Sequence, residues 1–593
     1  MSRGLALFLG VLLVVGSALG ANPPSGGHQL EFDHPFLSWK LYGAKRNVAT
    51  LSEIKVSGQP FRHALQLEVG ECTHREHDLV LGGKIVEHIR EGDALLLSFY
   101  IRCPESADES ALGRCHVVGQ AKRSSRPISL FGKTIVAGKK WKRIFVPFAA
   151  PIDNDLGYTV TFRMGGTKPQ TLQIAKLEVV NYRKKRKLEK LPSTETHYPG
   201  MEPDAPWRKA AAARIEQYRK ADLQIAVVDR NGRPVPGARL HVELKKHAFG
   251  FGVAVGLNSM FSDRHPEDAA QYRAAVEDLF NKVVFENRMK WKFYRDNDSQ
   301  LKEAMAWCAE RDLPIRGHCM VWAAWKRLPR GMEQEFAGRN DEFKRVIGEH
   351  VHKMATTYPD TFVEWDVVNE LHTQHEFVDM YGKEVVVDWF RMAKESNPNF
   401  TSYINDYAIL AGYDQPHQDG YFEWIKYLLE QGAPVEGIGL QGHFRAPIPP
   451  EEILRRLDRF AQFGLEMQIT EYDFDETDEL LQARFTRDFM TVVFSHPQTT
   501  GIMTWCLWEN AASKPQAAFF SSDWKKKRIA QAWEYMVKKE WHTEKNLTTG
   551  KDGAARVRGF LGDYEITVLY AGRRKTIPFS LDREGGTCSI RIN

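Results

Sequence analysis

The stretch Phe362-Val363-Glu364-Trp365-Asp366-Val367-Val368-Asn369-Glu370 is a mainly apolar run that ends in an amide and a carboxylate. A short apolar run bounded by polar residues is typical of a buried parallel strand. Similar runs, separated by amphipathic helical stretches, recur every 30 to 50 residues between about residues 248 and 540. The strand-like runs lie at 249–255, 282–285, 314–321, 362–368, 401–404, 437–440, 466–469 and 501–507.

Eight strand–helix units in roughly 290 residues predict a closed barrel of eight parallel strands with helices outside, the (β/α)8 or TIM barrel. A doubly wound open sheet is the alternative. No glycine-rich phosphate loop follows the early strands, which weakens that alternative.

The chain outside these units divides by composition. Residues 28–183 hold short alternating runs without intervening helices, which predict a jelly-roll-like β-sandwich. Residues 184–221 begin in a basic run and predict an exposed linker followed by a lead-in helix. We assign 222–540 to the barrel domain and 541–593 to a short β-rich extension. The fold class is therefore multidomain.

The N-terminal residues indicate export. A short basic start, an apolar run over 5–15 and small residues before Ala21 predict a signal peptide over residues 1–20. The apolar run is too short to span a membrane comfortably, so we expect cleavage, a secreted (extracellular or periplasmic) location and a mature form outside the membrane. The chain holds seven cysteines, and in an exported protein Cys103 and Cys115 are candidates for a local disulfide.

Overall composition is that of an ordinary globular protein. Of 593 residues, 43% are hydrophobic and 26% charged, which excludes a mainly disordered, collagenous or coiled-coil chain. The net charge of +5 is small, so charge gives no case for nucleic acid as a partner. Fifteen Trp and nineteen Tyr offer flat faces that suit sugar rings, although most such residues are core.

Candidate catalytic residues lie where the strand-like runs stop. Function in such barrels sits at the carboxyl ends of the strands. Glu370 ends the fourth run and Glu471 ends the seventh. Two carboxyls at one barrel mouth suit acid–base and nucleophilic work on a glycosidic bond. A lone Glu after a strand is usually a surface charge, but here both stand among aromatic and amide residues.

Other strand ends supply groups that suit the recognition of sugar hydroxyls and rings. These candidates are Glu286, Asn287, Lys290, His318, Trp322, Asn369, Gln441, His443 and Trp505. A zinc site built from the two histidines and a Glu is an alternative. The helical His-x-x-x-His spacing is absent, so we expect no metal ligand set.

These strand ends closely resemble those of glycoside hydrolase family 10, the endo-β-1,4-xylanases, over about residues 222–540. The motif at 365–370 matches the family's acid/base motif, and 469–473 matches its nucleophile motif. The resemblance implies Glu370 as acid/base, Asn369 as partner to the sugar 2-hydroxyl, and Glu471 as nucleophile. It also implies that His443 holds the nucleophile beside Gln441, that Trp505 lies under the sugar, and that the remaining candidates grip the glycone.

The chain departs from the family pattern at three places. Arg288 stands where a Glu is common, Ala323 where a His is common, and Ser513 where a second aromatic is usual. Trp508 is a candidate substitute for that aromatic. These changes leave both carboxylates in place but bear on the distal sugar subsite.

The resemblance implies a secreted, retaining endo-β-1,4-xylanase that acts on xylan, uses no cofactor and is a monomer. Another β-1,4-glycan hydrolase on the same barrel and a non-catalytic polysaccharide-binding protein stay open as alternatives. The N-terminal sandwich resembles carbohydrate-binding modules in pattern. Trp39, Tyr42 and Phe99 are candidate stacking residues there, although strand aromatics are more often core.

Overall fold

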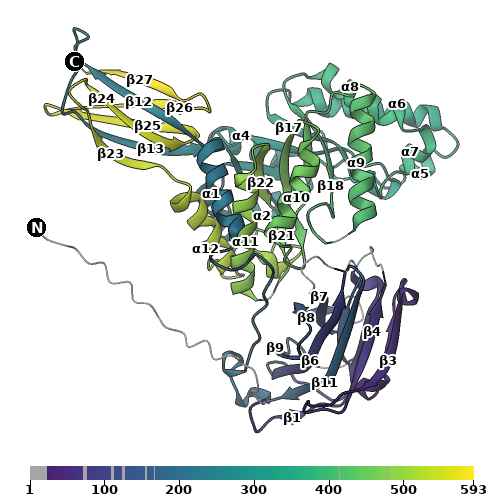
Figure 1. Cartoon of the computed structure of the whole chain (residues 1–593). Helices are drawn as coiled ribbons and strands as arrows, with labels where there is room; N and C mark the ends of the chain where they lie inside the picture. Colours follow the sequence, from purple (N-terminus) through teal and green to yellow (C-terminus); the bar gives the residue numbers. More distant parts are fainter. Residues whose placement is uncertain are drawn as a thin grey trace, which may run out of the picture. The chain divides into compact units, whose positions relative to one another are not determined.

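The computed structural model describes residues 23–70, 76–107, 112–122, 127–153, 157–165, 167–412, 414–476 and 478–592. The chain forms two compact units that divide between Thr196 and His197 (Figure 1). The predicted signal peptide at 1–20 and Cys72 lie outside the described residues. Among the residues described, no helix is both long and apolar enough to cross a membrane.

The N-terminal unit is the predicted β-sandwich. One antiparallel sheet has the order β3-β4-β11-β6-β9, with β1 on β11, and the other has the order β2-β5-β10-β7-β8. The first sheet comprises β1 (His28–Gln29), β3 (Ala49–Lys55), β4 (His63–Val69), β6 (Ala94–Ser106), β9 (Lys142–Ala149) and β11 (Gln170–Asn181). The second comprises β2 (Lys40–Tyr42), β5 (Val80–Ile85), β7 (Gly113–Ala121), β8 (Ile128–Ala137) and β10 (Tyr158–Arg163).

Alternating side chains of both sheets fill one shared core. Trp39 and Phe99 are buried in that core, so the idea that they stack on sugar is wrong. Cys103 and Cys115 are buried there as free thiols, so the expected local disulfide is not formed.

The stretch predicted as an exposed linker instead packs against the two units. Leu191 packs with Leu96 and Phe145 on the outer face of the first sheet, and Phe145 N donates to Thr194 Oγ1 at 2.9 Å. Residues 184–196 therefore belong to the sandwich. Tyr198 and α1 (Pro206–Tyr218) join the core of the second unit. Apolar residues spaced along the stretch bury themselves, which outweighs the exposure expected from its basic start.

The second unit contains the predicted closed parallel barrel. Its strand order is β19-β18-β17-β16-β15-β14-β22-β21, and β19 pairs with β21 to close the ring. The strands are β14 (Gly250–Val255), β15 (Lys282–Phe285), β16 (Ile315–Val321), β17 (Phe362–Asn369), β18 (Thr401–Asp406), β19 (Gly437–Leu440), β21 (Glu466–Phe474) and β22 (Thr499–Thr504), with the short β20 (His443–Phe444) beside β21. Each coincides with a predicted run to within a few residues.

Helices cover the outside of the barrel (Figure 1). They are α2 (Leu257–Met260), α3 (Pro266–Leu279), α4 (Ser299–Ala309), α5 (Met332–Glu335), α6 (Asn340–Thr357), α7 (Glu376–Tyr381), α8 (Glu384–Ser396), α9 (Gln415–Glu430), α10 (Pro450–Ala461), α11 (Glu479–Ser495) and α12 (Arg528–Tyr535). Asp298, Asp414 and Asp478 cap α4, α9 and α11 with their side chains, which fixes where these helices begin.

Residues 222–247 do not belong to the barrel, which corrects the predicted boundary. Strand β12 (Lys220–Val228) pairs with β24 (Ala554–Phe560) and β27 (Gly586–Arg591). Strand β13 (Arg239–His247) lies between β23 (Glu544–Thr548) and β25 (Gly562–Tyr570), and β26 (Arg573–Leu581) completes that sheet. Figure 1 shows both early strands among the yellow C-terminal ones. The predicted extension at 541–593 is therefore one part of a small, discontinuous double sheet.

The burial patterns of β12 and β14 explain why the predicted start of the barrel domain was wrong. Every residue of β14 is buried, whereas burial alternates along β12. Alternation marks a strand with one wet face, and strands inside a (β/α)8 barrel are buried on both faces. The alternating pattern at 222–228 was therefore a signal against the barrel.

Candidate active site

Glu370 stands directly after β17, at the carboxyl end of the barrel. Its φ of +57° lies in the left-handed region, which is strained for a residue with a Cβ. Its backbone N–H donates to Asn405 O at 2.8 Å, which holds this turn. Trp322 Nε1 donates to Glu370 Oε2 at 3.1 Å, and Gln441 Nε2 to Oε1 at 3.3 Å. Side chains from two other strand ends thus orient the carboxyl group, and a third strand end holds its backbone.

Glu471 lies on β21 and is buried. His443 Nε2 lies 3.0 Å from Glu471 Oε2, and Asn405 Nδ2 donates to Oε1 at 3.1 Å. His318 Nε2 lies 3.9 Å from the same Oε1. The carboxylate is therefore surrounded by donors and cationic groups.

One hydrogen-bonded chain joins the two acids. Asn405 Nδ2, which bonds Glu471, also donates to Asn369 Oδ1 at 2.9 Å. Gln441 Nε2, which bonds Glu370, lies 3.5 Å from the same Asn369 oxygen. Residues remote in the sequence thus meet at one mouth, as predicted. Asn369 Nδ2 is buried and finds no partner among the described residues, so it is a free donor within the site.

The surroundings push the two acids in opposite directions. Burial, reinforced by the negative charges of Glu471 and Asp406, raises the pKa of Glu370 to about 7. Burial would also raise the pKa of Glu471. The hydrogen bond from His443 and the positive charges nearby outweigh it and lower that pKa to about 2. Near neutral pH the pair can hold one proton on Glu370 and one charge on Glu471.

A second carboxylate stands behind the histidine. His443 Nδ1 donates to Asp473 Oδ2 at 2.6 Å, and Lys514 Nζ donates to the same carboxylate at 2.7 and 2.8 Å. Burial opposes a charge on His443, but Asp473 and Glu471 prevail and raise its pKa to about 9. A protonated His443 donates to Glu471, which keeps the latter ionised.

The remaining predicted residues lie around this pair. Burial raises the pKa of Glu286. The positive charge of Lys290 lowers this pKa, and the negative charge of Glu471 raises it further, but burial has the largest effect. Asn287 Oδ1 accepts from Lys290 Nζ at 3.2 Å. That ammonium lies 5.4 Å from the ring centre of Trp322 and 5.9 Å from that of Trp505. The ring of His318 lies 5.5 Å from Trp505. All eleven predicted residues are therefore linked by contacts around one site.

Sequence reasoning missed several supporting residues. Asn405, which contacts both halves of the site, ends the 401–406 strand, and that position was the available signal. Asp366, which accepts from His318 Nδ1 at 2.8 Å, lies inside a matched motif. No sequence pattern marks Lys514 or Arg327. Arg327 stacks 3.5 Å from the ring centre of Trp322 and lies 3.9 Å from Glu370 Oε2.

The structure accounts for one departure from the family pattern, Arg288, and bears on the candidate substitute for the missing aromatic, Trp508. The guanidinium of Arg288 donates to Asp298 Oδ2 and to Gln300 Oε1, each at 2.7 Å. These bonds stabilise the loop after β15. Trp508 is buried and stacks on Trp524 at 4.7 Å, so it is wrong as a substitute sugar platform.

Known proteins resemble this chain over the barrel region. Residues 242–535 match the model of glycosyl hydrolase family 10. Anti-sigma-I factor RsgI6 of Acetivibrio thermocellus is 28% identical over 393 residues, which cover 64% of this chain and 49% of that protein. Endo-1,4-beta-xylanase 1 of Arabidopsis thaliana is 26% identical over 391 residues, which cover 64% of this chain and 40% of that protein.

The chain thus spans about half or less of the length of these two relatives. Native xylanase 10B from Thermotoga maritima, a solved structure, is 25% identical and covers 49% of this chain and 96% of its own, with a TM-score of 0.44. The matched segment contains both acids and every strand of the barrel. Residues 242–535 of this chain therefore form a glycosyl hydrolase family 10 domain.

Proposed function

We propose that the chain is a secreted, retaining endo-β-1,4-xylanase that cleaves internal bonds of xylan. The observation that carries the proposal is the pair of acids with opposed pKa shifts, joined through Asn405, Asn369 and Gln441. The family of its barrel domain and the named activity of one relative support the substrate. The apolar N-terminal run supports export.

The mechanism follows from the two protonation states. Glu471 attacks the anomeric carbon, and Glu370 gives its proton to the departing glycosidic oxygen. Glu370, now a carboxylate, takes a proton from the water that releases the sugar from Glu471. Asn369 Nδ2, the free buried donor, would bond the 2-hydroxyl of the sugar in the site.

A reducing-sugar assay on xylan and on cellulose tests the proposal, with Glu471→Ala as the inactive control. We expect product from xylan and none from the control. Product mainly from cellulose would favour another β-1,4-glycan hydrolase, and no product from either would favour a binding protein. Proton NMR of the first product should show retained anomeric configuration, and inverted product would contradict the assigned roles.

The sandwich has its own candidate sugar site, on the outer face of the first sheet. Arg102 Nε donates to Gln173 Oε1 at 2.7 Å, and Gln173 Nε2 donates to Gln66 Oε1 at 2.5 Å, so a polar row crosses β6, β11 and β4. Beside it, the ring of Phe61 lies 5.0 Å from Tyr100 and 4.9 Å from Trp141. Ordered amides beside aromatic rings suit a polysaccharide chain.

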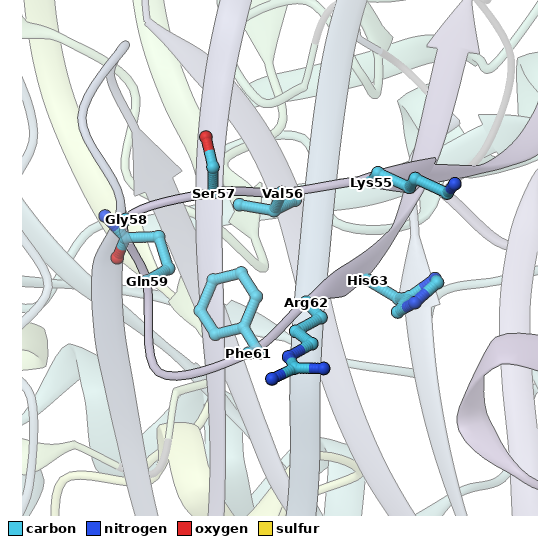
Figure 2. A pocket seen from close by; sticks show the side chains of 8 residues that line it. All are labelled: Lys55, Val56, Ser57, Gly58, Gln59, Phe61, Arg62 and His63. Carbon is cyan, nitrogen blue, oxygen red and sulfur yellow. The ribbon is translucent and has the colours of Figure 1, made fainter.

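The loop between β3 and β4 borders this face. Figure 2 shows Phe61 beside Arg62 in that loop. The loop lines a hollow of about 500 Å³. We propose that the sandwich binds polysaccharide here. In the inactive Glu471→Ala protein, Trp141→Ala should weaken retention in gels containing xylan. Tyr570→Ala, which removes an exposed ring from the second unit, is the matched control. Equal retention of both variants would contradict this site.

A further inference from the structure

Two stretches of the loops at the barrel mouth are rich in basic residues, although Glu286, Asp296 and Asp298 flank the first of them. Residues 287–295, after β15, read NRMKWKFYR, and residues 322–331, after β16, read WAAWKRLPRG. Across the whole chain 81 basic residues face 76 acidic ones, so this is a strong local excess. The basic residues of the two loops are Arg288, Lys290, Lys292, Arg295, Lys326, Arg327 and Arg330.

The two loops touch each other and the catalytic residues. Lys292 Nζ donates to Lys326 O at 3.1 Å, which joins the loops. The Arg327 guanidinium stacks on Trp322, whose indole N–H bonds Glu370. The buried Nε of Arg327 has no hydrogen-bond partner among the described residues. The inner end of the basic stretch therefore borders the group that protonates the leaving oxygen.

Most of these cations form no ion pair among the described residues, because most acidic side chains nearby bond other groups. Asp298 pairs with Arg288, and Asp296 with Lys353. Glu376 accepts from the backbone of Trp325 at 2.9 Å. Within the described part of the chain, no carboxylate lies within 4.0 Å of the side-chain nitrogens of four residues, and Arg327 has only Glu370. The four are Lys292, Arg295, Lys326 and Arg330.

An exposed aromatic ring stands among these cations. Phe293, between Lys292 and Arg295, is 45% exposed. An exposed phenyl face beside a cleft suits the apolar face of a pyranose ring, and clustered cations attract anions to a cleft. The two together fit a sugar polymer that carries negative charge.

We propose that Lys292, Arg295, Lys326, Arg327 and Arg330, the basic rim, bind carboxylates of uronic-acid side groups on the xylan chain. This inference rests on the proposed xylanase function and names the decoration that the enzyme prefers. Because the rim adjoins Glu370, a chain that reaches the catalytic acids passes it. An acidic protein bound to the rim would block the approach of substrate to Glu370. We therefore assign the rim to the substrate and not to a protein partner.

The test compares three oligosaccharides with one backbone: one with a uronic-acid branch, the same molecule with its carboxyl reduced to an alcohol, and the unbranched chain. The rim variant is Lys292→Gln, Lys326→Gln and Arg330→Gln. Its charge-matched control is Lys302→Gln, Lys344→Gln and Lys551→Gln, which removes three exposed cations outside the two loops. At low salt the parent and control should show a kcat/KM about fivefold higher for the acid than for its reduced form, through KM.

The rim variant should lose this preference and still cleave the unbranched chain. Salt at about 0.3 M should shrink the preference of the parent, because such charges are screened beyond about a Debye length. Equal kcat/KM for acid and reduced forms in the parent would overturn the rim proposal alone. So would an equal loss on all three substrates in the rim variant. No cleavage of any substrate by the parent would instead overturn the proposed function.

Discussion

The two glutamates of the site, Glu370 and Glu471, differ in what surrounds each carboxyl group. Glu370 and Glu471 are the same residue type, yet one contacts an indole and an amide and the other a protonated histidine. The difference separates their pKa values, about 7 against about 2, by far more than their exposure alone would. In the proposed mechanism, this difference in environment is what makes Glu370 the acid and Glu471 the nucleophile.

The pH dependence of activity should be bell-shaped. Glu471 must be ionised and Glu370 protonated. Activity should therefore rise as pH increases through the low pKa of Glu471, and fall as pH increases through about 7, the pKa of Glu370. Initial rates on an unbranched xylo-oligosaccharide, measured from about pH 3 to 10, check the fall near pH 7; the rates should already be near their maximum at the acidic end, because the pKa of Glu471 lies below this range. A plateau that extends unchanged to pH 9 would contradict the role of Glu370.

Substitution of Glu370 should depend on the leaving group. Glu370→Ala removes the proton donor, so xylan cleavage should slow by about 10²- to 10⁴-fold. Aryl xylosides with a good leaving group need little proton donation, so their first step should slow much less. Pre-steady-state release of the aryl group measures that step. If both substrate types slow alike, Glu370 is not the acid.

At the scale of strands, the barrel interior contains a buried charged layer. Arg316 on β16 is almost fully buried and donates to Glu364 at 2.9 Å and to Gln468 at 3.0 Å, and it is also paired with Asp366. Asp366 in turn orients His318 at 2.8 Å. The layer connects the packing of β16, β17 and β21 to the geometry of the site above it.

Breaking this layer should be costly. Arg316→Met leaves Asp366 and part of Glu364 without a counter-charge, which should lower the free energy of unfolding by about 3–5 kcal/mol. Arg345→Met, which removes an exposed helical pair with Glu349, should change it little. Urea unfolding followed by tryptophan fluorescence compares the two. Equal effects would mean that the buried layer is not a stabilising network.

The barrel strands were predictable because they are buried on both faces, so that each reads as a short run of mainly apolar residues, as β14 (GFGVAV) does. The site was predictable because strand ends meet at one mouth. Asn405 stands at such a strand end and could have been found in the same way, whereas Lys514 and Arg327 could not, because their importance depends on which neighbour each contacts. Strands β12 and β13 were misassigned because their partners lie some three hundred residues later, and alternation does not reveal a partner.

At the scale of the second unit, the small double sheet and the barrel form one continuous core. Phe494 on α11 stacks at 4.2 Å on Trp541, and lies 6.1 Å from Phe560 on β24. Buried residues of β12 and β13 belong to the same cluster as the barrel residues. The C-terminal segment is therefore part of the stability of the catalytic unit.

Removal of the C-terminal segment should disrupt the catalytic unit. A chain ending at Glu540 exposes the apolar faces of β12 and β13, and we expect a lower Tm and loss of soluble protein. A chain of residues 197–593, which omits the sandwich unit, should keep cooperative unfolding. Soluble yield and thermal denaturation followed by circular dichroism compare the two. A soluble, active 1–540 chain would contradict this account.

The split double sheet has a consequence during translation. Strands β12 and β13 leave the ribosome long before β23–β27 are synthesised. Their backbone edges and apolar faces therefore stay without these partner strands while the barrel residues are being translated. The nascent catalytic unit is thus completed only after β27 has emerged, and products that stop before it carry an exposed edge that chaperones and proteases can recognise.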